Sequence, residues 1–466
     1  MKKNKFFKMK SLALVLSLLL ISLSSCEKQW IDSDLNIDPD SPADVPMGLI
    51  LPGAQLAMGF VLVGNDNVRT NNIWTQHFDG VSRQSATEAR YQLTSADVGN
   101  VWSSTYTSIL MNLDILVEKS KLEGSESPYF RGVAQVMQAT TLGITTDIFG
   151  DIPFSKALGG GQGNLRPEYD TQEQIYDTIF NILDDAILNL NAEENVLPIS
   201  GDAIYDGDRS KWTKAAYSIQ ARHYLQTSNK TGNDAYTNAL AAVEKGFASN
   251  ADDYLVPFED ENRNPIFQFM EQRGDIRMGS TFVDLLLEND DPRLSFYAAE
   301  DGDGNYVGSE PGSENALASA PGTYAASPTS SSVMMTFAEL KFIEAEARLM
   351  MSGGDIALAQ AAYEDAVAAS VLRVTGEANT EWLDENINGV AVTLASIIKQ
   401  KYIDGFATNQ PYADYRRTGF PNLELAAGAV IPQIPTRFPY PQSEFDYNNE
   451  NVPSANKLTD KVWWDQ

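Results

Sequence analysis

Cysteine and histidine are almost missing from this sequence: its 466 residues include one cysteine, Cys26, and two histidines, His77 and His223. One sulfur cannot form an intramolecular disulfide, and a thiol without neighbouring histidines or cysteines does not make a zinc site. No nucleophile elbow, His-Glu-x-x-His pair, phosphate-binding loop or dinucleotide fingerprint is present, so the motifs predict no enzyme. His223 lies in a helical pattern, which favours a packed or surface position over a catalytic one.

Basic residues are scarce too, because 34 Lys and Arg face 63 Asp and Glu and the formal net charge is −29. Such a surface repels phosphate backbones, so nucleic acid is not expected as a partner. So many carboxylates always produce apparent acid/base pairs, and no glycosidase pair can be nominated from spacing alone. A hydrolase is therefore the weakest of the alternatives. Hydrophobic residues make up 43% of the chain, which is enough for a folded core.

Long apolar runs are absent except near the start, where residues 12–23 follow five lysines and are interrupted only by two serines. This arrangement is typical of a secretory signal, and the run is shorter than the ~20 residues that span a bilayer. Leu23-Ser24-Ser25-Cys26 resembles a bacterial lipobox, whose cysteine is lipidated and becomes the first mature residue. We predict a cleaved signal peptide over 1–25 and a lipid on Cys26; the alternative is an ordinary signal peptide with an incidental cysteine.

Residues 26–46 are polar and contain Pro39, Pro42 and Pro46, which predicts an extended, flexible tether. Beyond it the apolar pattern is helical, and a mainly α fold is expected. Apolar side chains recur at spacings of three, four and seven over 129–150 and again over 171–190. Thr171 followed by Gln174 resembles a capping box at the start of the second helix.

Helices are predicted to recur in pairs. Residues 334–376 contain one helix, a turn at Gly353-Gly354, and Asp355 as the N-cap of the next helix. Residues 211–246 repeat this plan, with alanines where the two helices would touch. Units of roughly 34 residues with two helices each are typical of tetratricopeptide-like stacking.

Residues 257–332 differ from the rest of the chain. They appear as a loop-rich excursion, partly extended at first and then dominated by Gly, Ser, Pro and Ala. Long loops of this kind are either functional or disordered. Asp301, Asp303 and Asn305 occupy alternating positions, as the first ligands of a calcium-binding loop do. The sixth position of such a loop is Tyr306 here instead of glycine, which favours a solvated turn. Calcium is the only cofactor that the sequence suggests, and only weakly.

Several segments resemble a known family. "YADYRRTGFP" and "IPTRFPYPQSEFDYNNEN" are similar to the closing signature of the SusD/RagB outer-membrane lipoproteins. Earlier segments match that family in the same order: "LNIDPDSPADVPMGLILPGAQ", "TTDIFGDIPFSKAL", "YDTQEQIYDTIFNILDDAI", "DGDRSKWTKAAYSIQARHYLQ", "ENDDPRLSFY" and "FAELKFIEAEARLMMSGGD". The resemblance covers nearly the whole mature chain.

The resemblance implies a single SusD-like domain over 47–466, with tetratricopeptide-like helix pairs supporting an irregular ligand-binding half. It also implies a Bacteroidota cell and a lipid anchor in the outer membrane, facing the exterior. The implied partner is a SusC-like, TonB-dependent β-barrel transporter, over which the protein would act as a hinged lid delivering oligosaccharides. Peptide binding and a helical-repeat scaffold without a nutrient ligand remain alternatives.

Sugar binding uses aromatic platforms for the apolar face of a pyranose and polar side chains for its hydroxyls. Two segments could supply them. The first, before the first clear helix pair, offers Trp74, His77, Phe78, Arg83, Arg90 and Tyr91; the second, within 257–332, offers Arg263, Phe267, Tyr306 and Tyr324. For each aromatic residue, core packing is the competing interpretation. Trp102 and Trp212 are predicted to be core, and Arg416-Arg417 to be structural.

Overall fold

The computed structural model describes residues 45–466, so the predicted signal peptide, Cys26 and most of the predicted tether lie outside the described residues. Residues Met47–Gln466 form one compact, mainly helical unit. Its helices are α2 (Met47–Val61), α3 (Asn65–Trp74), α4 (Arg83–Ala89), α5 (Gly99–Ser104), α6 (Met111–Lys119), α7 (Pro128–Phe149), α8 (Gln172–Leu190), α9 (Arg209–Gln226), α10 (Ser228–Thr231), α11 (Asn233–Val243), α12 (Pro265–Gln272), α13 (Ser280–Leu287), α14 (Leu294–Tyr297), α15 (Thr323–Ala326), α16 (Phe337–Met350), α17 (Ile356–Thr375), α18 (Thr380–Asn386), α19 (Leu394–Asp404), α20 (Gln410–Thr418) and α21 (Gln442–Tyr447).

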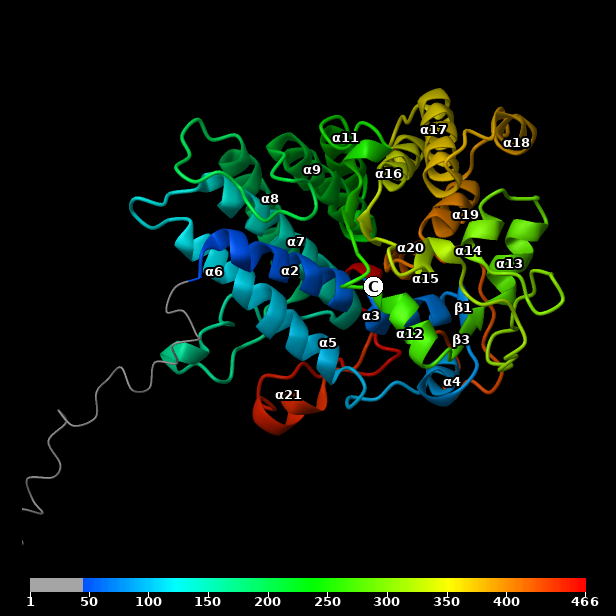
Figure 1. The fold of residues 1–466 in the computed structure, drawn as a ribbon, viewed down its shortest axis with the longest axis horizontal. Coiled ribbons are helices and arrows are strands. Elements are labelled where there is room, and N and C mark those ends of the chain that lie inside the picture. The colour runs from blue at the N-terminus through cyan, green and yellow to red at the C-terminus, as the bar shows by residue number, and fades with distance from the viewer. Residues whose placement is uncertain (1–44) are drawn as a thin grey trace, which may run out of the picture. The chain divides into compact units, whose positions relative to one another are not determined.

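The long helices stack in chain order, and each packs on the next: α6 on α7, α7 on α8, α8 on α9, α9 on α11, α11 on α16, and α16 on α17. Figure 1 shows this row running along the upper part of the view, from α8 to α17. The predicted helix pairs and the tetratricopeptide-like scaffold are therefore confirmed. Successive helices bury their apolar stripes against each other, because no single stripe can be covered by its own helix.

Local capping explains where these helices begin. Thr171 and Gln174 form the predicted capping box at the start of α8, and the Asp355 side chain accepts the Leu358 N–H at the start of α17. Each cap satisfies backbone N–H groups that have no partner inside the helix. The predicted boundaries are confirmed because they depend on interactions within four residues.

Short strands organise the irregular half of the unit. Strand β1 (Phe78–Gly80) pairs antiparallel with β3 (Ile276–Met278), and β2 (Tyr254–Val256) pairs with β4 (Ser332–Met335). These pairings bring the segment around 80 next to the segment around 277, which is remote in sequence. Figure 1 shows β1, β3, α3, α4 and α12 gathered below the row of long helices.

The 257–332 segment is more regular than its composition predicts. It holds α12, β3, α13, α14 and α15, and the part taken as extended is the helix α12 followed by β3. Asn264 caps α12 by accepting the N–H groups of Ile266 and Phe267, and Pro265 occupies the first turn. The irregular part is fixed by the buried carboxylate of Asp79, which accepts the Gly312 N–H at 2.8 Å and the Ser309 hydroxyl at 2.6 Å.

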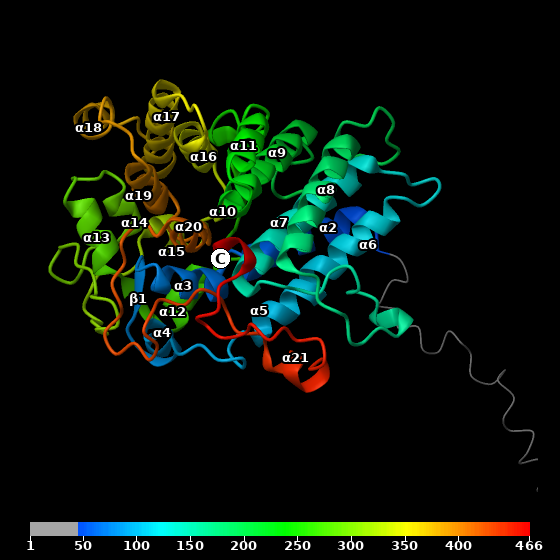
Figure 2. The same ribbon diagram turned by 180° about the vertical axis from the view of Figure 1, so that it is seen from behind.

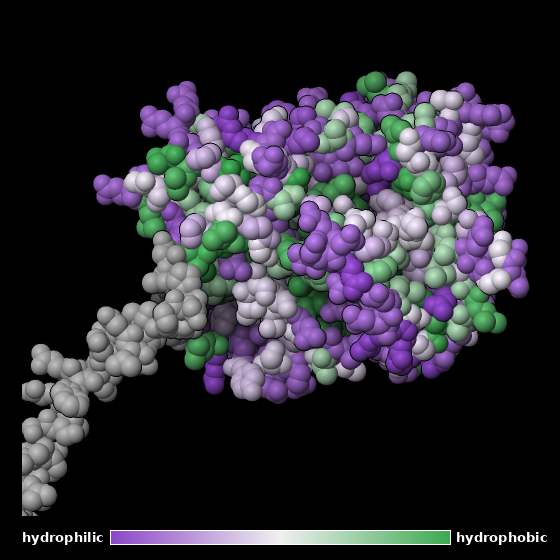
Figure 3. Space-filling model, viewed as in Figure 1, coloured by the Kyte–Doolittle hydropathy of each residue, from purple (hydrophilic) through white to green (hydrophobic). Residues whose placement is uncertain are grey.

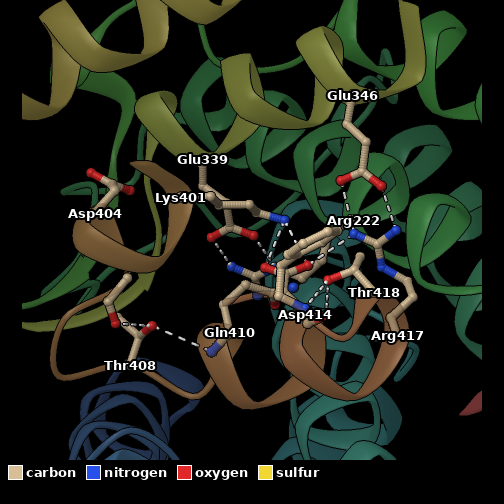
Figure 4. Close-up of polar contacts among 12 residues, drawn as sticks. Arg222, Glu339, Glu346, Lys401, Asp404, Thr408, Gln410, Asp414, Arg417 and Thr418 are labelled. Carbon is tan, nitrogen blue, oxygen red and sulfur yellow. Dashed lines mark hydrogen bonds and ion pairs between the residues drawn. The ribbon is translucent and has the colours of Figure 1, made fainter. Parts of the chain in front are cut away.

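Buried ion pairs join helices within the row and connect the row to the C-terminal helices α19 and α20 (Figure 4). Arg417 of α20 lies between Glu346 of α16 and Asp414, and Lys401 of α19 contacts Asp414 at 3.0 Å. Arg222 of α9 forms a bidentate pair with Glu339 of α16, with both N···O distances 2.7 Å. Burial alone would raise the pKa of Asp414, but Lys401 and Arg417 outweigh it and lower that pKa.

The predicted structural residues take the expected places. Trp102 and Trp212 are buried in the core. Arg416 donates to the backbone carbonyls of Asp147 and Thr436, at 2.7 and 2.9 Å. The structural role predicted for Arg416 and Arg417 is therefore confirmed.

One described segment, Met47–Trp74, is long and apolar enough by composition to cross a membrane, although the sequence predicts no second span. Half of its most apolar window is buried inside the unit, and α2 ends at Val61 before α3 begins at Asn65. The segment packs as two helices of the folded core.

Candidate ligand-binding site

The two segments predicted to supply a ligand site meet at an open groove of about 510 Å³. Helices α3, α4 and α5 form one side, and α12 forms the other, where Figure 1 places them next to one another. Figure 3 shows mostly hydrophilic residues over α12 on this face. The groove is lined by Phe60, Asn65, Asp66, Arg69, Thr70, Gln84, Glu88, Leu93, Ala96, Asp97, Val98, Asn100, Val101, Pro265, Gln268, Phe269, Gln272, Arg273 and Phe438.

An ion pair fixes the floor of the groove. Arg69 donates to both carboxylate oxygens of Glu88, at 3.0 and 2.9 Å, and the two side chains are 6% and 1% exposed. Gln84 donates to the same carboxylate at 3.0 Å, and the Arg69 guanidinium lies 4.9 Å from the centre of the Phe269 ring. Burial alone would lower the pKa of Arg69, but Glu88 outweighs it and raises that pKa. The floor is therefore charged, paired and geometrically fixed.

The walls are rich in side-chain amides, which can both donate and accept hydrogen bonds. Asn65 and Asn100 come from the α3 and α5 side, and Gln268 and Gln272 come from α12, one turn apart on the same face. The Oδ1 atom of Asn65 is shielded from solvent and has no hydrogen-bond partner. Such a lining suits the hydroxyls of a sugar or the backbone of an extended peptide.

Four of the predicted platform residues are core residues instead, and the prediction of ring platforms at Trp74, His77, Phe78 and Tyr91 is corrected here. Their exposed fractions are between 0 and 2%, so no ring face is open to a sugar. Trp74 packs 5.1 Å from Phe438 and donates to the Glu88 carbonyl. These four residues belong to the core that supports the helices lining the groove.

His77 illustrates why these rings turn inward. Its imidazole lies 3.9 Å from the Tyr402 ring, and its Nε2 and Nδ1 atoms contact the Tyr402 carbonyl at 2.9 Å and the Thr75 hydroxyl at 3.0 Å. Burial lowers the pKa of His77 to about 3. The imidazole is a neutral part of an aromatic core.

The two arginines predicted in the first segment lie at the surface but already have partners. Arg83 pairs with Asp275, donating from Nε at 2.9 Å, and Arg90 pairs with Glu314. Both pairs join the segment around 83–90 to residues from 275 to 314. Neither arginine lines the groove.

The second set of predicted residues also lies beside the groove and not in it. Arg263 pairs with Glu271 at 3.1 Å and covers Phe267, which lies on the other side of α12 from Phe269. Tyr324 packs edge-on against Tyr297 at 5.1 Å, and the Tyr306 side chain is half-buried. Of the ten predicted positions, none lines the groove, although each segment contributes neighbours that do.

The segment of the weak calcium prediction forms a turn closed by its first aspartate. Asp301 Oδ1 accepts the backbone N–H groups of Asp303 and Asn305, both at 2.9 Å, and so closes a turn. Within residues 45–466 no group of three or more His, Cys, Asp or Glu side chains is placed to hold a metal ion. Calcium binding stays a prediction from the sequence.

A signal for the residues that do line the groove was present in the sequence. "RNPIFQFMEQ" contains the pair Asn264-Pro265, which is typical of a capped helix start with proline in the first turn. Read as a helix, this segment puts Gln268 and Gln272 on one face and Phe267 on another. Arg69 and Glu88 have no comparable signal, because their pairing spans two separate helices.

Comparison with known proteins decides the family. The sequence profile of the SusD-like family, described as "starch-binding associating with outer membrane", matches residues 44–441. The chain belongs to the SusD-like family. Members of this family associate with the outer membrane and are binding proteins. Among curated proteins no match is found.

Solved structures of SusD-like proteins resemble this one closely. A chitin-binding protein is 26% identical, with a TM-score of 0.78 over 90% of this chain and 100% of that one. A SusD/RagB family protein from Bacteroides thetaiotaomicron is 25% identical, with a TM-score of 0.78 over 91% of this chain and 99% of that one. A chitin-binding SusD homolog from Flavobacterium johnsoniae is 23% identical and has the same fold, with a TM-score of 0.76, over 90% and 99% of the two chains.

Proposed function

We propose that this SusD-like protein binds oligosaccharides, without converting them, in the groove between α3, α4, α5 and α12. The observation that carries the proposal is the amide-lined groove over the fixed Arg69–Glu88 pair. The description of the family as starch-binding and the chitin binding of a structure 26% identical to this chain support a saccharide ligand.

Binding without reaction also suits Glu88, the buried carboxylate of the groove. Both oxygens of Glu88 accept hydrogen bonds from Arg69 within a buried pair. A general acid or base must reach the proton that it transfers. Glu88 is held instead as part of the floor.

We propose further that Cys26 carries the lipid anchor and that the protein delivers its ligand to a SusC-like, TonB-dependent barrel as its lid. The lipobox resemblance of residues 23–26 and the outer-membrane association of the family support this part. Labelled palmitate should be incorporated by the wild type and not by Cys26→Ala. Surface exposure is tested by proteinase treatment of intact cells, and the barrel partner by affinity purification from detergent-solubilised membranes.

The groove is tested by calorimetry with a panel of neutral oligosaccharides. We expect micromolar to millimolar affinity for at least one of them, weakened in Gln268→Ala and Gln272→Ala because each removes an amide from the wall. The matched control is Gln442→Ala on α21, an exposed glutamine outside the groove. Equal affinity in all variants would place the ligand elsewhere.

Peptide binding is the second candidate function, favoured by one observation: the groove offers many amides but few open ring faces. Mass spectrometry of ligands that co-purify from cell extract separates the two. Peptides that are lost from Gln268→Ala would replace the saccharide proposal.

A further inference from the structure

A second groove, of about 400 Å³, crosses the helix-pair scaffold away from the irregular half. Helix α9 packs against both α8 and α11 and so forms the floor, while those two helices form the walls. Figures 1 and 2 both show the three helices side by side. Tyr217, Gln220 and Tyr224 lie at spacings of three and seven along α9, which puts them on one stripe facing the groove.

The floor carries two aromatic rings. Tyr217 and Tyr224 are both half-buried and lie two helical turns apart, roughly 10 Å along the axis. Phe180 braces the Tyr224 ring in a stack with 4.2 Å between ring centres and 12° between planes. The Lys245 ammonium lies 5.2 Å from the Tyr217 ring, on an exposed and flexible side chain that a ligand could displace.

Polar groups surround the two rings. Gln220, only 5% exposed, lies between them and donates to Asp184 Oδ1 at 2.7 Å. Asp184 stands on the α8 wall, Asn238 stands on the α11 wall, and Lys245 follows just after the end of α11, all three exposed. Between them the small side chain of Ala241 leaves the α11 wall open.

We propose that this groove is a second saccharide-binding site, which takes a neutral oligosaccharide segment across Tyr217 and Tyr224. Aromatic rings cover the apolar faces of sugar rings, and the aspartate, amides and ammonium bind hydroxyls. The charges of Asp184 and Lys245 oppose each other across the groove, and the chain as a whole carries −29, so an anionic glycan is disfavoured.

A protein helix is a poorer occupant of this groove. Helix-binding grooves present a continuous apolar surface to several anchors. Here the large aliphatic side chains, Ile187 and Leu188, stand on the α8 wall only, and the facing wall is small or polar. This proposed site shares no residue with the groove at α12, so saccharide binding at each groove can be tested separately.

Calorimetric titration of the full-length protein in detergent with maltohexaose, cellohexaose and chitohexaose tests the inference. For a hexasaccharide that binds, we expect two sites per chain in the wild type. Tyr217→Ala should weaken the second site by about tenfold or more, because it removes one platform. Ala241→Leu should do the same by filling the groove while keeping a good helix former.

Matched control variants distinguish a loss of binding at the α9 groove from a general loss of folded protein. Tyr447→Ala removes a 74% exposed tyrosine on α21, and Ala361→Leu enlarges an exposed alanine on α17; both should leave two sites. Gln268→Ala combined with Gln272→Ala should remove the other site and leave the one on α9. If Tyr217→Ala lowers the melting temperature, its binding result is set aside, and the effect of Ala241→Leu on saccharide affinity tests the second site.

Two outcomes overturn the inference. One is a single site that is lost with Gln268→Ala and Gln272→Ala but is unchanged by Tyr217→Ala and Ala241→Leu. The other is the absence of binding at α9 for all three hexasaccharides. A single site that responds only to the α9 variants would instead support this inference and remove the ligand from the α12 groove.

Discussion

Gly143 of α7 lies directly beneath the imidazole of His223 on α9, so closely that a Cβ atom at position 143 would stand 2.2 Å from the His223 Cε1 atom. His223 is 2% exposed, and its ring also meets Tyr176 edge-on at 5.4 Å. Of the two positions predicted for this histidine, packed or surface, the structure shows the packed one, and the two helices owe their close approach to the missing side chain.

Gly143→Ala is expected to destabilise the protein by about 1–3 kcal/mol, because the new methyl group would force His223 or the backbone aside. Denaturant unfolding followed by circular dichroism measures the change. Gly53→Ala is the matched control, since Gly53 lies inside α2 with no atom within 4 Å of its Cβ position. That change should be neutral or stabilising by up to about 1 kcal/mol. Equal effects of the two substitutions would contradict the packing argument.

Trp74→Ala is expected to unfold the protein partly or fully instead of weakening ligand binding alone. The ring is fully buried against Tyr412 and Phe438, and removing such a side chain costs about 3–5 kcal/mol. Thermal unfolding and calorimetry on the same samples distinguish the two effects. A variant with unchanged stability and lost saccharide binding would show that the ring contacts ligand after all.

Arg69→Met should be strongly destabilising, by about 3–5 kcal/mol, because it leaves the buried Glu88 carboxylate without its partner. The double variant Arg69→Met, Glu88→Met should recover much of this loss, since no charge then remains buried. Lys121→Met serves as control: its pair with Glu118 has side chains 47% and 63% exposed, and its loss should cost less than about 1 kcal/mol. If the losses in unfolding free energy of Arg69→Met and Glu88→Met add up to the loss of the double variant, the two side chains are not coupled.

The stability of the protein should depend on His77 below neutral pH. Burial lowers the pKa of His77 to about 3, so between about pH 6.5 and 3 the unfolded chain binds a proton that the folded protein does not. The contribution of His77 to stability therefore falls as the pH drops through this range, by up to about 1.4 kcal/mol per pH unit. Burial raises the pKa of Asp147 to about 6 and that of Asp253 to about 7, and these groups act in the opposite direction.

Because those groups act in the opposite direction, the pH dependence of the wild-type unfolding free energy does not report on His77 alone. The test therefore compares the unfolding free energies of the wild type and His77→Gln at each pH. The stability difference between the two proteins should shrink, or change sign, as the pH is lowered from 7 to 4. Urea unfolding at several pH values measures it. A difference that stays constant would mean that the buried imidazole gains its proton in the folded state as readily as in the unfolded one.

The helical scaffold could be predicted from the sequence because its determinants are local. Thr171 with Gln174, and Asp355 after two glycines, define helix starts through contacts within four residues. The groove could not be predicted in the same way. Arg69 and Glu88 are brought together by the packing of α3 on α4, and their joint position over Phe269 depends on α12, about two hundred residues later.

The misplaced aromatic residues have two different causes. Phe267 and Phe269 would share a face in a strand but lie on different sides of a helix, so a partly extended segment does not separate Phe269, which lines the groove, from Phe267, which does not. Trp74, His77, Phe78 and Tyr91 were misplaced because a polar segment can still bury its rings when β1 pairs with β3 behind them. Composition alone does not reveal such a pairing.

The cluster of Glu346, Asp414, Arg417 and Lys401 ties α16, α19 and α20 together without access to water. Separating those helices would expose or orphan several charges at once, so α16, α19 and α20 should hold one arrangement when their surroundings change. The part of the scaffold that they form should therefore keep the same shape whether or not either groove holds a ligand.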